Sequence, residues 1–373
     1  MKLFKKLLAI MLALSCAFAV IACDKDGDEE LDTTKHGWAL EYDLEEDGED
    51  TFVVIEGLFL SDGDKYALSE EDYETIDLTI GVDGKITVPV YDEDDKPVYE
   101  NDILKTEVIE LGETYKGFKI ADAAFTNQII IGSVTIDASV VEVGMTAFAG
   151  CSNIEKMELP FVGVKDGAVN ASKLFASIFG TAESTGCTAV TCSYNNSGSA
   201  TYYVPSSLTE VVVNYADGQT LPEYAFSGVT TLKKVTVNGI TKVSKNAFAG
   251  CTGLSTVVLP DEVTEIGKSA FKGCTALMNF AFPASVEVIF QEAFYGCTKL
   301  GYGKTVTLVI NAKTIHEKAF YGCTSISKIE LNNVETIGAA AFYNCSSLKS
   351  KVVNSSATVA DDAFYGCHED LND

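Results

Sequence analysis

The sequence predicts a β-rich repeat solenoid, in which short parallel strands stack from one repeat to the next. The first observation is an Ala-Phe pair that recurs through most of the chain. Its phenylalanines are Phe125, Phe148, Phe226, Phe248, Phe271, Phe294, Phe320, Phe342 and Phe364. Their successive spacings are 23, 78, 22, 23, 23, 26, 22 and 22 residues. A unit of 22 or 23 residues, interrupted by one long insertion, therefore repeats, and such a period is typical of solenoids.

The second observation is the apolar pattern inside each unit, which is clearest between Leu254 and Cys274. Its apolar positions are Leu254, Val257, Leu259, Val263, Ile266, Ala270 and Phe271. An L-x-x-L-x-L core with a later Asn or Cys is the leucine-rich repeat pattern. We expect these positions to stack on their equivalents in neighbouring units, while Ser255, Thr256 and Val258 point outward. Because no unit buries its apolar face alone, stability is expected to come from the interfaces between units.

The full phrase L-x-x-V-x-L-P, then V-x-x-I-G, then A-F-x-G-C resembles the BspA-like leucine-rich repeat of bacterial surface proteins, over about residues 103–373. Within the predicted insertion, residues 161–207, LFASIFG at 174–180 and YVPSSL starting at 203 resemble a longer repeat form of that family. The resemblance implies a parallel strand stack with short helical or irregular returns. It also implies protein recognition or adhesion, without naming the ligand.

The N-terminal residues 1–22 are interpreted as a lipoprotein signal peptide. Lys2, Lys5 and Lys6 precede an apolar run that is too short to span a membrane. The following Val-Ile-Ala-Cys resembles a bacterial lipobox, which would leave Cys23 lipidated at the new N-terminus. The alternative is an ordinary signal peptide with an incidental Cys. The expected location is the bacterial cell envelope, with the chain lipid-anchored to the membrane and surface-exposed.

Acidic residues are concentrated ahead of the repeats. Residues 24–102 hold 28 of the 54 acidic residues and five Lys, a net charge of −23, whereas residues 103–373 carry a net charge of −7. Residues 23–35 are interpreted as an acidic tether, and residues 36–102 as a small acidic β module with Asp-Gly turns. The negative field and the absence of Arg exclude nucleic acid as a partner.

Two acidic runs, Asp43–Asp50 and Asp92–Asp95, are rich in oxygen ligands. Neither has the spacing of a calcium-binding loop, and solvated charge is the commoner explanation. Catalytic motifs are also missing, because His36, His316 and His368 lie far apart outside any nucleophile or metal motif. The sequence therefore predicts no metal site, no cofactor and no enzyme.

The cysteines fall into two sets. One set shares a single repeat position and comprises Cys151, Cys251, Cys274, Cys297, Cys323, Cys345 and Cys367. These are interpreted as packed free thiols rather than disulfides, although neighbouring strand spacing alone would not forbid pairing. A zinc site is disfavoured because the row is linear. Cys187 and Cys192 lie in the insertion and could close a small hairpin through a disulfide in an exported protein.

A row of tyrosines is the candidate partner-binding stripe. The residue after the repeat Phe is Tyr295, Tyr321, Tyr343 and Tyr365 in the last four units. Tyr is enriched at interfaces, although packing of each Tyr against its neighbours, without a partner, is the commoner explanation. The insertion offers a competing site around an Asn/Ser/Gly-rich stretch, with Phe175, Phe179, Tyr194, Tyr202 and Tyr203.

These observations together predict a surface-anchored bacterial lipoprotein that presents a solenoid for non-catalytic recognition of a protein on a host, a matrix or a neighbouring cell. The alternative is a structural envelope component or spacer without a specific ligand. Carbohydrate binding is a third hypothesis, for which the tyrosine row is the expected site.

Overall fold

The computed structural model describes residues 38–47, 50–60, 75–92, 98–100, 103–302 and 307–372. The predicted signal peptide, Cys23 and the tether lie outside these residues. The chain divides into two compact units. Of the first, the structure describes mainly the short antiparallel pair of β5 (Tyr99–Glu100) and β6 (Ile103–Leu104). The second comprises Leu40–Leu58, Thr75–Val88 and Val108–Asp373, and it contains the repeats.

The strands that precede the repeats already join the stack. These strands are β1 (Trp38–Asp47), β2 (Asp50–Leu60), β3 (Ile76–Ile80) and β4 (Lys85–Pro89), with the short 3-10 turn η1 (Val82–Gly84). The middle of β2 pairs in parallel with β8 (Phe118–Ile120), and β3 pairs in parallel with β9 (Ile131–Ile136). β4 pairs with β7 (Thr106–Glu110). Alternating apolar residues such as Val53 and Leu78 are fully buried there. The small β module that precedes the repeats therefore pairs directly with the first repeat strands.

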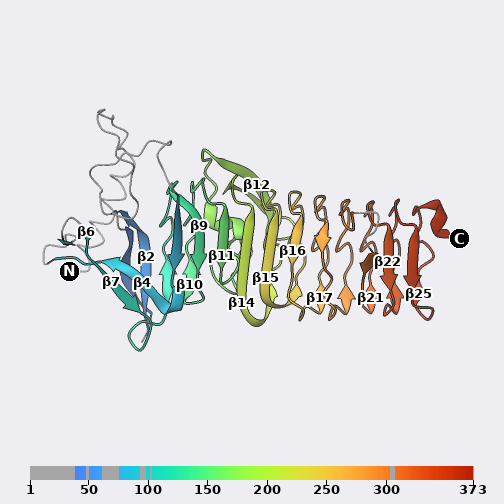
Figure 1. Ribbon diagram of the computed structural model, residues 1–373, viewed down its shortest axis with the longest axis horizontal. Coiled ribbons are helices and arrows are strands. Elements are labelled where there is room, and N and C mark those ends of the chain that lie inside the picture. The colour runs from blue at the N-terminus through green and yellow to red at the C-terminus, as the bar shows by residue number, and fades with distance from the viewer. Residues whose placement is uncertain are drawn as a thin grey trace. The chain divides into compact units, whose positions relative to one another are not determined.

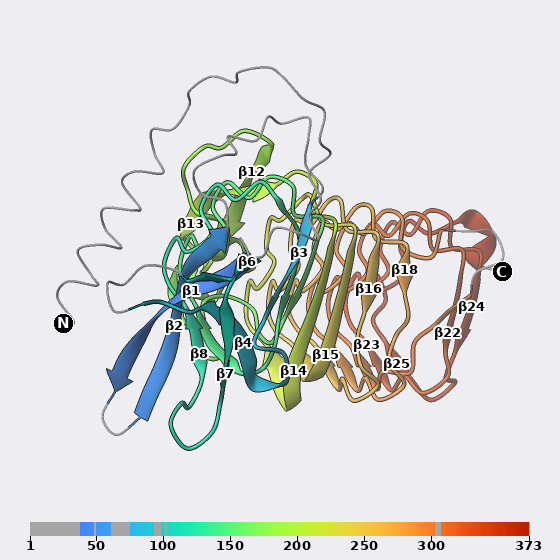
Figure 2. The same ribbon diagram turned by 60° about the vertical axis from the view of Figure 1, so that its left-hand side comes forward.

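The repeats form two rows of parallel strands that run side by side along the stack (Figure 1). The first row continues from β9 through β11 (Lys156–Leu159), β14 (Glu210–Leu221), β15 (Lys234–Val243), β16 (Thr256–Val258) and β18 (Asn279–Phe280). Its last strands are β20 (Thr307–Val309), β22 (Lys328–Leu331) and β24 (Ser350–Val353). The second row contains β8, β10 (Val140–Val143), β17 (Glu265–Ile266), β19 (Val288–Ile289), β21 (Thr314–Ile315), β23 (Thr336–Ile337) and β25 (Thr358–Val359). β14 and β15 are long enough to extend through both rows (Figure 2).

The core lies between these rows and the A-F-x-G-C corners. Leu254, Val257, Val263 and Ile266 are at most 3% exposed, as the repeat pattern predicts. From Phe226 to Phe364 the repeat phenylalanines form a continuous stack, the phenylalanine ladder, with ring centroids 4.9–5.2 Å apart and interplanar angles of 3–11°. The predicted parallel strand solenoid is therefore confirmed.

The insertion leaves the first strand row uninterrupted. Met157 of β11 pairs directly with Val211 of β14, so the repeats on either side of the insertion are neighbours. The insertion itself contains η2 (Asn170–Lys173), η3 (Phe175–Phe179) and an antiparallel hairpin of β12 (Cys187–Ser193) and β13 (Ser199–Pro205). η3 fills the corner row at this level, because Phe175 lies 5.2 Å from Phe226 between ring centroids.

The last repeat ends with a short 3-10 turn, η4 (Glu369–Asn372). Its Leu371 is 6% exposed, and the Leu371 carbonyl accepts a hydrogen bond from Lys351 Nζ at 3.0 Å. The same ammonium lies 5.2 Å from the centre of the Phe364 ring. Lys351 therefore covers the end of the phenylalanine ladder. It stands at a strand position that is apolar in other repeats.

Candidate binding surface

Each A-F-x-G-C corner directs two adjacent side chains in opposite directions. In the unit around Phe294, the backbone is left-handed at Glu292 (φ 59°) and at Gly296 (φ 72°), on either side of the Phe-Tyr pair. Phe294 is fully buried, whereas Tyr295 is half-buried on the outside. Successive corners are joined by backbone hydrogen bonds such as Phe294 N to Ala319 O, at 2.7 Å. The corners therefore recur at the strand spacing, and each one points its Phe into the core and the next residue outward.

The predicted tyrosine row forms a stacked tyrosine ladder, comprising Tyr295, Tyr321, Tyr343 and Tyr365. Successive ring centroids are 4.8, 5.1 and 5.2 Å apart, with interplanar angles of 3°, 2° and 29°. The first three side chains are half-buried, and Tyr365 is 67% exposed. The tyrosines thus pack against each other and still present a continuous outer edge.

The stacking decides which part of each ring a ligand can reach. Tyr321 and Tyr343 have a tyrosine against each face, and Tyr295 has Tyr321 on one face. Lys272 Nζ lies 4.9 Å from the Tyr295 ring centre, and Lys272 belongs to the preceding repeat. The stacked rings therefore leave little free face on which a sugar ring could stack. The ladder offers ring edges and phenol hydroxyls instead.

Lys272 links the tyrosine ladder to a neighbouring cavity. Its ammonium donates a 2.7 Å hydrogen bond to Glu292 Oε2, and this interaction lowers the pKa of the Glu292 carboxyl. Lys272 also lines a cavity of about 510 Å³, together with Thr191 and Ser193 of β12 and the corner glycines Gly228 and Gly250. The small corner residues of these earlier repeats leave this space beside the hairpin.

The competing site in the insertion is largely part of the core. Phe175, Phe179 and Tyr202 are each at most 2% exposed, so a ligand cannot reach them. Tyr194 and Tyr203 are half-buried. Phe175 takes the place of a repeat phenylalanine beside Phe226, and Phe179 packs against Phe175, so these apolar residues contribute to the core.

The repeat cysteines form a cysteine ladder of free thiols, as predicted. Each Sγ donates a hydrogen bond to the carbonyl of the repeat Phe in a preceding turn, for example Cys297 to Phe271 at 3.1 Å and Cys345 to Phe320 at 3.3 Å. Burial raises the pKa of Cys151 to about 12, and it raises the pKa of Cys297 well above its ordinary value. Protonated, enclosed thiols of this kind are poor nucleophiles.

The predicted disulfide between Cys187 and Cys192 does not form in this structure. Both cysteines belong to β12 and are free. Five residue steps along an extended strand place their Cα atoms about 16 Å apart, far beyond the limit of about 7 Å for a disulfide. Their cross-strand partners in the hairpin are Pro205 and Ala200. The prediction was wrong because both cysteines lie on one strand of the hairpin, and the turn does not bring them together.

The two described histidines each contact one neighbouring side chain. His316 stacks on Phe290, with ring centroids 5.2 Å apart, and His368 Nδ1 lies 3.2 Å from Asp370 Oδ2. No group of three or more His, Cys, Asp or Glu side chains converges as metal ligands within the described residues. Both acidic runs considered for calcium extend into residues that are not described. Among the described helices, none is long and apolar enough to cross a membrane.

The fold and this surface define a class of protein: a leucine-rich repeat scaffold with an exposed side-chain ladder. The family model for the BspA type leucine-rich repeat region matches residues 118–254, 196–303 and 241–371, with six copies. The chain therefore belongs to the BspA-type leucine-rich repeat family. No curated protein matches it.

Several solved structures are similar to this chain. A leucine-rich repeat protein from Eubacterium ventriosum is 20% identical over 68% of this chain and 83% of its own, with a TM-score of 0.40. A leucine-rich cell surface protein from Faecalibacterium prausnitzii is 15% identical over 90% of this chain and 96% of its own, with a TM-score of 0.31. A leucine-rich repeat protein from Bacteroides ovatus is 18% identical over 89% and 92%, with a TM-score of 0.29.

Proposed function

We propose that this chain is a non-catalytic, lipid-anchored protein of the bacterial cell surface that recognises a protein ligand through its tyrosine ladder. The observation that carries the proposal is the ladder itself, which is exposed along its edge and fixed by mutual stacking. Tyr supplies a large amphipathic contact area, and it is enriched at protein interfaces. Side chains that are ordered before binding lose less entropy on binding.

Charge favours a partner with a positive surface. The chain has a formal net charge of −27, and a complementary positive patch would steer the two proteins together. Lys272 and Lys318 lie near the ladder, but each is paired with a glutamate, Glu292 and Glu317 respectively. The edge of the ladder is therefore amphipathic rather than strongly charged. Such an edge suits a partner surface that has both apolar and polar groups.

Removing the ladder tests the proposal. The full chain, purified in detergent, is titrated against a panel of purified extracellular-matrix proteins and proteins from neighbouring bacterial cells. We expect saturable binding by the native chain and its loss when all four ladder tyrosines are replaced by Ser. A matched control replaces Val258, Val309 and Val352, which are 44–49% exposed in the first strand row, with Ser. This control should bind like the native chain.

Two outcomes would contradict protein recognition through the ladder. One is unchanged binding by a folded four-tyrosine variant, which would move the site elsewhere. The other is the absence of saturable binding by the native chain across the panel. The second outcome would favour a structural spacer, in which the tyrosines only strengthen the contacts between repeats.

The anchor is tested separately. Replacing Cys23 with Ser removes the proposed lipid attachment, so we expect the protein to move from the detergent phase to the aqueous phase in a phase-separation assay. Several acyl chains act together in such anchors, and the shift should be nearly complete. Equal partitioning of the native chain and the variant would rule out lipidation at Cys23.

A further inference from the structure

A column of asparagines follows the first strand row on the other side of the repeat from the corners. Asn214 pairs with Asn238 in the register of β14 and β15. In later repeats, Val309, Glu330 and Val352 are paired with one another in strand register. The residue two positions after each of them is again an asparagine: Asn311, Asn332 and Asn354. The repeats between the two groups carry Pro260 and Pro283 there instead.

The two groups of asparagines differ in how their amides are used. In the earlier group, Asn238 Nδ2 donates to Asn214 Oδ1 at 2.7 Å, and Asn214 Nδ2 donates to Glu158 Oε1 at 2.7 Å. In the later group, the side-chain amides of Asn311 and Asn332 have no hydrogen-bond partner among the described residues. The side-chain amide of the adjacent Asn333 also has no hydrogen-bond partner among the described residues. Three amides are therefore available to a ligand.

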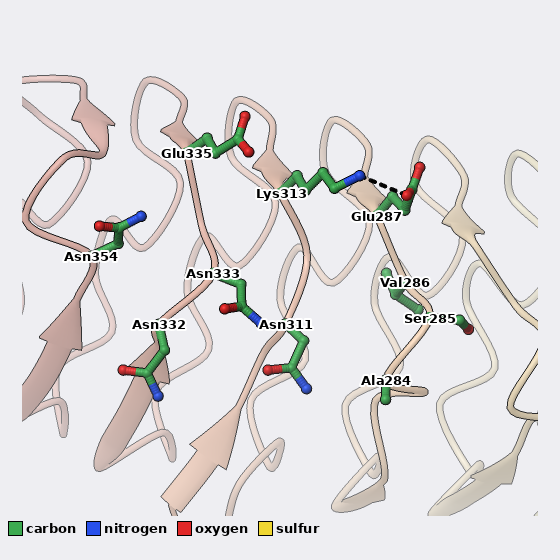
Figure 3. A pocket seen from close by; sticks show the side chains of 10 residues that line it. All are labelled: Ala284, Ser285, Val286, Glu287, Asn311, Lys313, Asn332, Asn333, Glu335 and Asn354. Carbon is green, nitrogen blue, oxygen red and sulfur yellow. Dashed lines mark hydrogen bonds and ion pairs between the residues drawn. The ribbon is translucent and has the colours of Figure 1, made fainter.

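These three amides line one cavity, the amide pocket, of about 520 Å³. Figure 3 shows Asn311, Asn332 and Asn333 gathered on one face, with Lys313 reaching toward Glu287 beside them. Lys313 Nζ lies 2.7 Å from Glu287 Oε1, and Glu335 lines the cavity from the next turn. The pocket thus combines the three amides with the carboxylates of Glu287 and Glu335 and with the Lys313 ammonium, which is paired with Glu287.

The chemistry of this lining selects a class of ligand. An amide both donates and accepts hydrogen bonds, and a carboxylate accepts two, which together match the adjacent hydroxyls of a sugar. Two carboxylates against one ammonium disfavour an anion. The amides of Asn311 and Asn332 also recur at the strand spacing, about 4.8 Å, so a chain of similar units can meet them one after another.

We infer that the amide pocket is a binding site for a neutral carbohydrate chain. The residues that line the pocket include no aromatic side chain, so the sugar is held by hydrogen bonds to amides and carboxylates rather than by ring stacking. The site shares no residue with the tyrosine ladder. It is therefore a second binding site, and it does not depend on the proposed recognition of a protein.

Affinity electrophoresis in gels that contain polysaccharides tests this inference. The full chain, kept in a detergent without a sugar headgroup, is run through gels with mannan, xylan, β-glucan or galactan, and through gels with acidic polygalacturonate. We expect at least one neutral polysaccharide to retard the native chain. The variant N311A/N332A/N333A should bind it at least about tenfold more weakly, because three hydrogen-bonding groups are lost.

Two controls show whether the retardation arises at the amide pocket. The replaced amides are exposed or half-buried and have no partner in the described chain, so the triple variant should keep its melting temperature. The four-tyrosine variant should be retarded like the native chain. The inference is overturned if no neutral polysaccharide retards the folded native chain, if the folded triple variant is retarded equally, or if polygalacturonate retards the native chain as strongly as a neutral polysaccharide.

Discussion

The phenylalanine ladder and the tyrosine ladder lie next to each other in sequence and differ only in which side of the corner they occupy. Phe294 and Phe320 have ring centroids 5.1 Å apart at 3°, and Tyr295 and Tyr321 have centroids 4.8 Å apart at 3°. The first pair is fully buried, whereas the second is half-buried. The repeat therefore sets the spacing of both ladders, and burial decides what each contributes to stability.

The largest expected effect comes from the inner ladder. Replacing Phe294 with Ala removes a fully buried ring that stacks on both neighbours, so the free energy of unfolding should fall by about 3–5 kcal/mol. The measurement is urea unfolding followed by circular dichroism. The matched control is Tyr295→Ala in the adjacent position. A similar loss in both variants would show that burial does not distinguish the two ladders.

An intermediate effect is expected from the cysteine ladder, which lies beside the phenylalanines. Replacing Cys297 with Ala removes the thiol that donates to Phe271 O at 3.1 Å and leaves that carbonyl with one partner fewer, at a cost of about 2 kcal/mol. Cys367 is half-buried in the last repeat, so Cys367→Ala should cost less than about 1 kcal/mol. Thermal unfolding of both variants under reducing conditions checks this order, and the reverse order would contradict it.

The smallest effect is expected in the outer ladder. Tyr321 stacks on a tyrosine at each side, so Tyr321→Ala should cost about 1 kcal/mol. Tyr365 has one tyrosine neighbour and is 67% exposed, and its replacement by Ala should cost no more than about 0.5 kcal/mol. The same urea assay resolves the difference. A loss at Tyr321 as large as that at Phe294 would make the tyrosine ladder chiefly a structural element.

Much of the fold was predictable because the repeat carries its own signal. The Ala-Phe spacing and the apolar positions of the unit from Leu254 to Cys274 predicted a parallel stack, and those positions are buried except for Leu259, which is half-buried. The row of free thiols was predicted for the same reason, since equivalent residues in a solenoid share one environment. The register in which β2 and β3 pair with the first repeat strands was not predicted, because these two strands lack the Ala-Phe phrase.

The candidate sites were less predictable. The tyrosine row could be read from the sequence, but its ring-on-ring stacking depends on side-chain directions that only the packed corners define. The amide pocket was missed because Asn311 and Asn332 stand in segments of different lengths, and their shared position emerges only from strand register. The disulfide prediction failed because the spacing of Cys187 and Cys192 does not show where the hairpin turns.

The sequence by itself determined the period, the parallel stacking, the inward face of each repeat and the position of the tyrosine row, because a repeated pattern can satisfy its apolar residues only by stacking on copies of itself. The tertiary structure alone decided which tyrosine surfaces stay accessible, how η3 of the insertion takes the place of a repeat corner, and which asparagines keep free amides. Those outcomes depend on contacts between residues far apart in the chain, such as Phe175 with Phe226 and Asn214 with Glu158, and no local pattern specifies them.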